Sequence, residues 1–184
     1  MNYFLQKIIA AILLTFSLPI FILVYVAIKM EDNGPIIFKQ KRKGKAKDFT
    51  LYKFRTMFEG AEEKKKDLMH LNEVDGPAFK IKDDPRFTRV GRVLSKTGVD
   101  ELPQLINVMR GEMALIGPRP LPVDEAKRVS KKYKRREAIL PGVTSLWIVR
   151  GAHRLTFEEW MRLDLEYIDE RSFFLDTKIA ILTL

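Results

Sequence analysis

The chain of 184 residues contains no cysteine and only two histidines. These absences exclude a disulfide framework, a thiolate zinc site and a cysteine nucleophile, and they nearly exclude a cluster of imidazoles. The sequence also lacks a Walker loop and a dinucleotide-binding glycine fingerprint. His70 and His153 belong to no motif and are interpreted as ordinary polar residues. A nucleophile in this protein must therefore be another group, and a carboxylate is suitable.

Acidic residues are scarce relative to basic ones: 24 Asp and Glu residues oppose 33 Lys and Arg residues, and the net charge is +9. A positive balance favours an anionic partner, which is nucleic acid, anionic lipid or a phosphorylated substrate. Composition alone does not choose among these three. The length suits a single domain with enough chain to bury a core.

Long hydrophobic runs are absent except at residues 8–28, where 21 consecutive residues carry no charge. As a helix this segment would be about 31 Å long at ~1.5 Å per residue, enough to cross the hydrocarbon core of a bilayer. A cleaved signal peptide is excluded, because its apolar run is about 7–15 residues and the charged Glu31 and Asp32 follow here. The mean hydropathy of −0.13 therefore averages a membrane segment with a polar remainder.

Pro19 lies in the middle of the apolar segment, where it removes a backbone hydrogen bond and kinks the helix. Lys7 precedes the segment, and a heavier group of Lys and Arg residues follows it. By the positive-inside rule, the end with more cations is cytoplasmic. A plain spanning helix and a helix–break–helix hairpin with both ends cytoplasmic remain alternatives from the residues alone.

Six cations and no acidic residue occupy positions 39–47, soon after the membrane segment. Such a cluster is expected to contact anionic headgroups, which contribute ~1 kcal/mol for each cation near the surface. A solvated hairpin is the alternative, and the two interpretations are compatible. Other elements are expected as follows: β-structure over 36–38, a strand over 49–54, a surface helix over 59–71, a loop over 72–86, and a short buried strand over 113–116.

The acidic pair Asp100 and Glu101 stands just before Pro103, which is tolerated only in the first turn of a helix. The spacing of the four apolar residues that follow predicts one buried helix face, made of Leu102, Leu105, Ile106 and Met109. The helix should begin near Asp100 and end at Gly111. The pair would then lie at a helix N-terminus, which also binds phosphate oxygens. The carboxylates are candidates for a nucleophile or a metal ligand, and simple N-capping by Asp100 is the alternative.

Arg119 stands between Pro118 and Pro120, so its backbone is stiff and its guanidinium loses little freedom on binding a phosphate. A stiff turn with a solvent-facing arginine is the alternative. Four further arginines are phosphate-binding candidates, and the last three share one face by their spacing: Arg55, Arg86, Arg89 and Arg92.

A capping box at Thr156 and Glu159 predicts the start of another helix. Its apolar stripe, which includes Phe157 and Trp160, should pack in the core or rest on the membrane interface. Asp164 falls seven residues after Phe157 on the same stripe. A carboxylate there must be paired or metal-bound, and a structural salt bridge is the favoured interpretation.

Several motifs occur together in one order: the Pro-broken apolar segment, Gly34-Pro35-Ile36-Ile37-Phe38-Lys39-Gln40, Lys53-Phe54-Arg55-Thr56-Met57, Asp84-Pro85-Arg86-Phe87-Thr88-Arg89-Val90-Gly91-Arg92, Asp100-Glu101-Leu102-Pro103-Gln104-Leu105, Gly117-Pro118-Arg119-Pro120, Pro141-Gly142-Val143-Thr144 and Arg162-Leu163-Asp164-Leu165-Glu166-Tyr167. In this order they resemble the bacterial sugar transferase family, the monotopic polyprenyl-phosphate phosphoglycosyl transferases. The resemblance covers most of the chain.

The resemblance implies a reaction in which a sugar 1-phosphate passes from a UDP-sugar to a polyprenol phosphate and UMP is released. It implies Asp100 as the nucleophile, Glu101 as its partner, Mg²⁺ as the cofactor, and Asp164 as a third metal ligand beside the acidic pair. Ser17 and Pro19 match the break in the membrane helix. The implied substrate-binding residues are the following: Lys53, Arg55, Arg86, Arg89, Arg92, Lys96, Pro118, Arg119 and Pro120.

The resemblance also implies an α/β fold: a compact mixed catalytic domain over 34–184, with amphipathic interfacial helices, behind a re-entrant membrane anchor over 1–33. The expected location is the cytoplasmic face of the bacterial inner membrane, as a monotopic protein among inner-membrane lipids and without nucleic acid. A few residues typical of the family are expected beyond Leu184. The alternative function is a non-catalytic, membrane-anchored binder of polyanions.

This chain departs from the family pattern at three places. The residue directly before the breaking proline is Leu18 instead of serine, with Ser17 one position earlier. Five residues before Asp100, where the family often has arginine, stands Ser95, and the neighbouring Lys96 is expected to hold the lipid phosphate. Residues 150–154 replace a Gly-Arg-Asn-like element, so the sequence does not identify the sugar.

Overall fold

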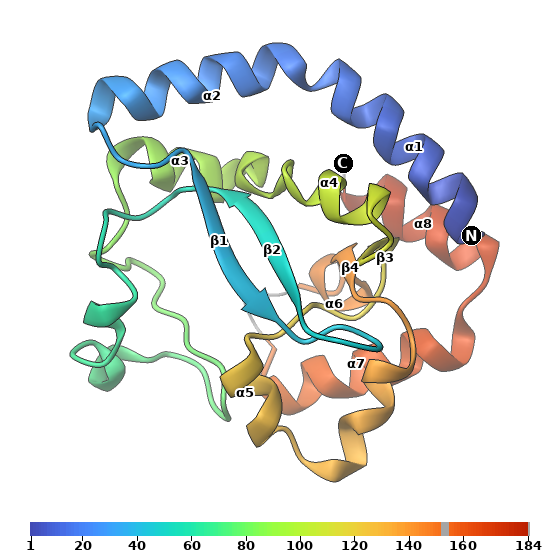
Figure 1. Ribbon diagram of the computed structural model, residues 1–184. Helices are drawn as coiled ribbons and strands as arrows, with labels where there is room; N and C mark the ends of the chain where they lie inside the picture. The colour runs from blue at the N-terminus through green and yellow to red at the C-terminus, as the bar shows by residue number, and fades with distance from the viewer. Residues whose placement is uncertain (152–154, 184) are drawn as a thin grey trace.

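The computed structural model describes residues 1–151 and 155–183. Two apolar helices, α1 (Tyr3–Phe16) and α2 (Leu18–Glu31), form an arch along one side of the molecule, and the polar part of the chain lies beneath it (Figure 1). Most of the large exposed hydrophobic side chains in the described residues belong to this arch. The surface of the arch is therefore unlike that of the rest of the protein.

The arch bends by 55° at Ser17, two residues before Pro19, as the sequence predicted. The Ser17 hydroxyl donates to the Leu13 carbonyl at 2.7 Å and so satisfies part of the interrupted helix. Among the described residues no single helix is long and apolar enough to cross a membrane, although α1 and α2 together have the required length and composition.

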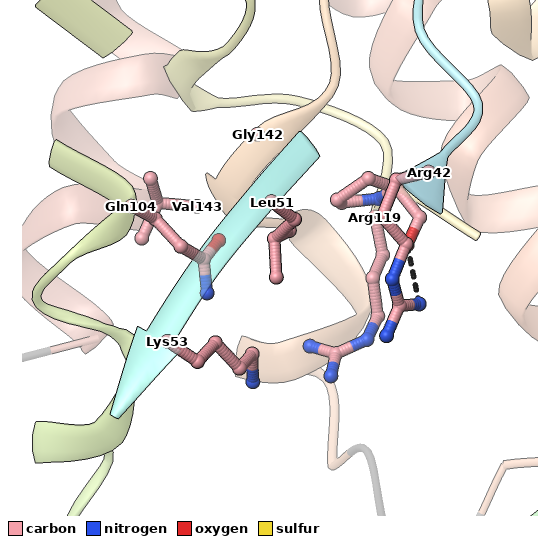
Figure 2. Close-up of a pocket in the computed structure, with 8 residues that line it drawn as sticks. Arg42, Leu51, Lys53, Gln104, Arg119, Gly142 and Val143 are labelled. Carbon is pink, nitrogen blue, oxygen red and sulfur yellow. Dashed lines mark hydrogen bonds between the residues drawn. The ribbon is translucent and has the colours of Figure 1, made fainter. Parts of the chain in front are cut away.

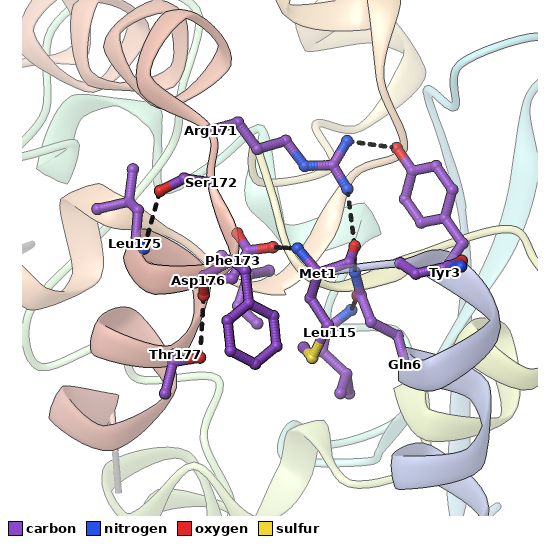
Figure 3. A network of polar contacts seen from close by, with 12 residues as sticks. Met1, Tyr3, Gln6, Leu115, Arg171, Ser172, Phe173, Leu175, Asp176 and Thr177 are labelled. Carbon is purple, nitrogen blue, oxygen red and sulfur yellow. Dashed lines mark hydrogen bonds and ion pairs between the residues drawn. The ribbon is translucent and has the colours of Figure 1, made fainter.

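The start of the chain is attached to the last helix, α8 (Phe173–Thr183). The Met1 amine pairs with the buried Asp176 carboxylate, and Arg171 donates to the Tyr3 hydroxyl at 2.9 Å (Figure 3). These contacts join two segments that are far apart in the sequence. They fix the orientation of α1 relative to the polar domain.

Strands β1 (Ile37–Arg42) and β2 (Phe49–Phe54) form an antiparallel hairpin, which confirms the strand predicted over 49–54. The register pairs Arg42 with Phe49 and Gln40 with Leu51. Side chains alternate between the two faces of a strand. Arg42, Leu51 and Lys53 consequently share one face of the hairpin.

Residues 39–47 lead away from the apolar arch, and their contact with lipid headgroups stays a prediction. Strand β1 begins near α2 and runs away from the arch, so the turn of the hairpin lies at the opposite end, near α5 and α7 (Figure 1). The Lys43 N–H donates to the Leu121 carbonyl at 2.9 Å. The hairpin, which is compatible with that prediction, is the observed structure, and its turn lies far from the arch because an extended strand rises by ~3.3 Å per residue.

Helix α3 (Arg89–Thr97) leads through Gly98, whose φ is 70°, into the 3-10 turn η3 (Val99–Glu101) and then α4 (Gln104–Met109). The predicted helix from Asp100 is therefore wrong at its start: a 3-10 turn precedes a shorter α-helix. The predicted apolar face is only partly buried, since Leu105 is buried but Met109 is 43% exposed. Helix α4 packs between α1 and β2, and the side chains that face these two elements are the buried ones.

The surface helix predicted over 59–71 is wrong. The structure has only two short 3-10 turns there, η1 (Glu63–Lys65) and η2 (Met69–Leu71). Neither turn buries a residue, and a charged segment without an apolar face gains too little from packing to form a longer helix. Residues 72–86, all of them described, form a loop as predicted.

The remaining elements complete a mixed fold in which helices dominate: β3 (Ala114–Ile116), α5 (Val123–Arg128), the 3-10 helix η4 (Lys131–Ala138), β4 (Gly142–Thr144), α6 (Leu146–Val149) and α7 (Phe157–Glu170). β3 and β4 pair in parallel, so the described residues contain two small sheets. The predicted buried strand and the capping box of α7 are both confirmed.

The apolar stripe of α7 packs in the core and does not rest on a membrane interface. Phe157, Trp160 and Met161 are buried, and the Trp160 ring stacks on that of Trp147 at a centroid distance of 4.9 Å. This core lies behind the loop that carries Arg119. The stripe therefore supports the site from within.

Substitution of Gly91 by alanine should destabilise the fold, because a Cβ atom there would lie 1.9 Å from the Thr56 carbonyl oxygen. Since that oxygen belongs to the backbone, relief requires α3 to move, and we expect a loss of about 3 kcal/mol. Thermal unfolding in detergent measures the effect. Ser95→Ala on the exposed face of α3 is the matched control, and an equal unfolding temperature for both variants would contradict this packing.

Candidate active site

The acidic pair lies in the 3-10 turn η3 and contacts a lysine from the hairpin. Lys53 Nζ is 2.6 Å from Glu101 Oε1 and 3.3 Å from Asp100 Oδ2. The structure therefore brings together three of the residues that the sequence singled out. Asp100 makes no capping hydrogen bond in this turn, so the N-capping alternative is not what the structure shows.

Arg119 approaches the same pair from the other side. Its Nη1 is 3.6 Å from Glu101 Oε1, and its guanidinium lies over the Trp147 ring at 5.6 Å from the centroid. Stacking on an aromatic face stabilises a guanidinium while leaving its edges free to donate. Glu101 is thus held between two cations.

The two carboxylates have opposite pKa shifts. Burial alone would raise the pKa of Glu101, but the charges of Lys53 and Arg119 outweigh it and lower the pKa to about 2. For Asp100, burial raises the pKa above its ordinary value despite the opposing charge of Lys53. A buried carboxylate beside a permanently ionised partner is a common feature of functional sites.

The loop at 117–120 is held by hydrogen bonds to three consecutive carbonyls. The carbonyls of residues 118, 119 and 120 accept from Gly142 N at 2.9 Å, Arg136 Nη2 at 2.6 Å and Arg42 Nη1 at 3.0 Å. Gly142 is required for this approach, since a Cβ atom there would lie 2.1 Å from the Gly117 nitrogen. The Arg119 side chain therefore projects from a fixed backbone.

A buried ion pair lies beneath this loop. Arg136 Nη2 and Nε donate to Asp164 Oδ2 at 2.7 and 2.9 Å, and both side chains are buried. The salt bridge predicted for Asp164 is confirmed. Asp164 pairs with Arg136, which also donates to the Arg119 carbonyl, so the pair supports the loop that carries Arg119. The role of Asp164 as a metal ligand stays a prediction.

A pocket opens beside Glu101 and is lined by three cations (Figure 2). They are Arg42, Lys53 and Arg119, accompanied by Leu51, Gln104, Pro120, Gly142 and Val143. Burial and the neighbouring charge of Arg119 lower the pKa of Arg42 to about 10. The same two causes lower the pKa of Lys80. The region holds more positive charge than its carboxylates balance, which favours binding of an anion.

The structure does not bring Arg55 and Arg86 to the carboxylates as free phosphate-binding groups. Arg55 pairs with Asp32 and donates to the Pro35 carbonyl at 2.6 Å. Arg86 pairs with Asp84 at 2.6 Å. Both guanidinia are buried, and their hydrogen bonds are made within the protein.

The prediction that Arg86, Arg89 and Arg92 present one common face is therefore wrong, because Arg86 is buried. Arg92 Nη1 lies 3.4 Å from Asp83. The N-terminus of α3 already contacts Glu31, which accepts from Arg89 N at 2.6 Å and from the next amide. Lys96 is exposed in the last turn of α3, and its role stays a prediction.

The donor set fits Mg²⁺ at Asp100 and Glu101. Mg²⁺ is commonly bound by one or two carboxylates together with substrate phosphates and waters, and these two side chains supply adjacent carboxylate oxygens. Residues 1–151 and 155–183 contain no group of three or more His, Asp or Glu residues arranged to hold a metal.

His153 lies outside the described residues, as does most of the 150–154 segment.

Sequence reasoning missed Arg42 and Gln104, which line the pocket beside the carboxylates, and Lys80, which lies near Arg119. Arg42 was grouped with the cations expected at the membrane. The alternation of the hairpin would have found it, since the register places Arg42 and Lys53 on one face. Lys80 comes from the loop over 72–86, whose path no local pattern indicates.

Carboxylates beside a cation-lined pocket are the arrangement required by an enzyme that transfers phosphorylated groups. The family model described as "Bacterial sugar transferase" matches residues 1–184, and the chain belongs to that family. The resemblance stated from the sequence motifs is thereby confirmed, as is the prediction of a transferase.

Three relatives illustrate this membership. The galactosyl transferase CpsE of Streptococcus agalactiae is 46% identical over 84% of this chain and 35% of its own length. The uncharacterized sugar transferase EpsL of Bacillus subtilis is 38% identical over 95% of this chain and 81% of its own. The undecaprenyl-phosphate galactose phosphotransferase of Salmonella typhimurium is 37% identical over 83% and 33%. The chain thus spans about a third of two relatives and most of the other.

Replacing Arg136 by methionine should leave Asp164 buried without its partner. We expect a loss of about 3–5 kcal/mol in the free energy of unfolding, measured by denaturant titration in detergent. Arg135→Met is the matched control, since Arg135 pairs with Asp169 on the surface and should cost about 1 kcal/mol or less. The double variant Arg136→Met with Asp164→Leu should recover most of the stability. Equal losses for Arg135 and Arg136 would contradict the support role of the buried pair.

Proposed function

We propose that this protein transfers a sugar 1-phosphate from a UDP-sugar to a polyprenol phosphate and releases UMP, as the first membrane step of glycan assembly. The observation that carries the proposal is the Asp100–Glu101 pair held by Lys53 and Arg119 in a member of the bacterial sugar transferase family. Two relatives support the acceptor, since they are named undecaprenyl-phosphate glucose and galactose phosphotransferases.

In the first step, an Asp100 carboxylate oxygen attacks the β-phosphorus of the donor. A new oxygen–phosphorus bond forms, the bridging phosphorus–oxygen bond breaks, and its electron pair goes to the departing UMP. Lys53 and Arg119 offset the repulsion between the anionic nucleophile and the anionic diphosphate. Burial of Asp100 keeps water away from the nucleophile.

In the second step, an oxygen of the polyprenol phosphate attacks the phosphosugar bound to Asp100. The new bond forms the lipid-linked product, and the Asp100 carboxylate is released for another cycle. Glu101, ionised because of Lys53 and Arg119, keeps both cations at the reacting groups. When bound at Asp100 and Glu101, Mg²⁺ would neutralise phosphate charge.

The acceptor is a lipid, so the site should lie at a membrane surface. We propose that α1 and α2 form a re-entrant anchor whose two ends are cytoplasmic, with the apolar arch in the bilayer. Exposed apolar side chains on α3, α4 and α8 extend this surface toward the site: Val93, Met109, Phe173, Phe174, Ile181 and Leu182. Lys96, in the last turn of α3, is proposed to hold the lipid phosphate.

Because the chain has no cysteine, single cysteines test the topology directly. Asn2→Cys before α1 and Lys45→Cys in the hairpin turn should both resist a membrane-impermeant maleimide in intact cells and both react in inverted vesicles. Lys45→Cys is the matched control for a cytoplasmic position. Reaction of Asn2→Cys in intact cells would contradict the re-entrant anchor and indicate a spanning helix.

Incubation with a UDP-sugar and Mg²⁺, without acceptor, should add the mass of one phosphosugar to the protein and release UMP. Asp100→Asn should abolish the adduct and lower turnover by at least about 10³-fold. Intact-protein mass spectrometry measures the adduct, and an assay of released UMP measures turnover. The matched control is Asp83→Asn, which alters an exposed carboxylate and should leave both unchanged.

Full turnover by Asp100→Asn would contradict the nucleophile assignment. Absence of both adduct and turnover in the wild-type protein, across a panel of UDP-sugars, would support the alternative of a polyanion binder. The panel also identifies the preferred sugar.

A further inference from the structure

We propose that Arg42 binds the α-phosphate of the donor and stabilises UMP as it leaves. The inference rests on the proposed function and deepens it, because it assigns the leaving-group end of the site. The sequence placed Arg42 among cations expected at lipid headgroups, and no role in the reaction followed from that placement. Three separate observations support the new assignment.

First, Arg42 faces the pocket that the carboxylates adjoin. It is the last residue of β1 and shares a face of the hairpin with Leu51 and Lys53. In Figure 2 the guanidinium of Arg119 lies between the Lys53 amine and the Arg42 guanidinium. The three cations therefore form a row that begins at the carboxylates and ends at Arg42.

Second, Arg42 differs from the other largely buried arginines in having no carboxylate partner among the described residues. Arg55, Arg86 and Arg136 each pair with an aspartate. Arg42 instead donates one hydrogen bond from Nη1 to the Pro120 carbonyl, and its buried Nε has no partner. The carboxylates of Glu62, Glu101 and Glu125 attract Arg42 without forming an ion pair with it, and burying a guanidinium without a directly paired anion is costly. A substrate phosphate would supply the missing anion through a charge-assisted contact.

Third, the row leads from the carboxylates to a side of the protein that a water-soluble nucleotide can reach, so in the proposed binding mode the donor lies along it. The β-phosphate must lie at Asp100, beside Lys53, for attack on phosphorus. The α-phosphate and nucleoside then extend along the row, past Arg119 and toward Arg42. This end of the hairpin is also the one that lies away from the apolar arch (Figure 1), where a water-soluble nucleotide can enter.

The chemistry of the first step explains the need for a cation at that position. Cleavage of the bridging bond transfers its electron pair to an α-phosphate oxygen, which gains negative charge as UMP forms. A donor fixed near that oxygen stabilises the transition state more than the bound substrate. In the second step UMP has already left, so Arg42 stabilises no leaving group during transfer to the lipid phosphate.

The test compares Arg42→Met with Lys41→Met, since Lys41 is an exposed cation on the adjacent position of the same strand. Calorimetry with UMP alone should show at least about 10-fold weaker binding for Arg42→Met. Adduct formation from a UDP-sugar should slow by about 10- to 100-fold. Discharge of isolated adduct by polyprenol phosphate should slow much less than adduct formation, because it loses only the support that Arg42 gives to the loop through the Pro120 carbonyl. Lys41→Met should match wild type in all three measurements.

Arg42→Lys separates folding from chemistry. It keeps a positive charge but loses the fork, so it should bind UMP with intermediate affinity, and its unfolding temperature shows whether the hairpin remains intact. Unchanged UMP affinity and adduct formation in Arg42→Met would overturn the inference. Equal slowing of formation and discharge would overturn the leaving-group assignment. If wild-type protein forms no adduct, the proposed function fails, while UMP affinities still decide whether Arg42 binds the nucleotide phosphate.

Discussion

The structure depends on one constraint: the backbone around Arg119 must be fixed so that its guanidinium meets Glu101. Arg136, which is paired with Asp164, donates to the Arg119 carbonyl, while Gly142 and Arg42 donate to the neighbouring carbonyls. These partners come from four different parts of the chain. Contacts with this loop therefore help to position three parts of the fold: the parallel strands, the α7 core and the hairpin.

A second consequence is electrostatic. Fixing Arg119 near Arg42 and Lys53 concentrates positive charge that the two carboxylates do not balance. Burial, and after it the charge of Arg119, lowers the pKa of Arg42. The same charge keeps Glu101 ionised. An anionic substrate relieves the repulsion among the cations. Because folding has already positioned these cations, binding costs little further reorganisation of the protein. In the proposed function the cations therefore serve two tasks, which are to hold the carboxylates and to attract the donor.

Local sequence patterns predicted those features that local physics determines. The helix break near Pro19, the strand over 49–54 and the capping box at Thr156 need only neighbouring residues to be recognised. The roles of Arg86 and Arg42 were not predicted, because each depends on a partner brought by tertiary folding: Asp84 pairs with the first, and the pocket faces the second. The helix expected over 59–71 does not form for a related reason, since the segment has no apolar face that packs against the rest of the protein.

In the proposed reaction, a covalent phosphosugar on Asp100 separates UMP release from transfer to lipid. Isotope exchange tests it most directly: wild-type protein is incubated with a UDP-sugar and labelled UMP in the complete absence of polyprenol phosphate. The account predicts that label enters the UDP-sugar, because the first step is reversible and independent of the acceptor. Exchange that appears only after polyprenol phosphate is added, in a protein that turns over normally, would contradict it and indicate direct transfer between the two substrates.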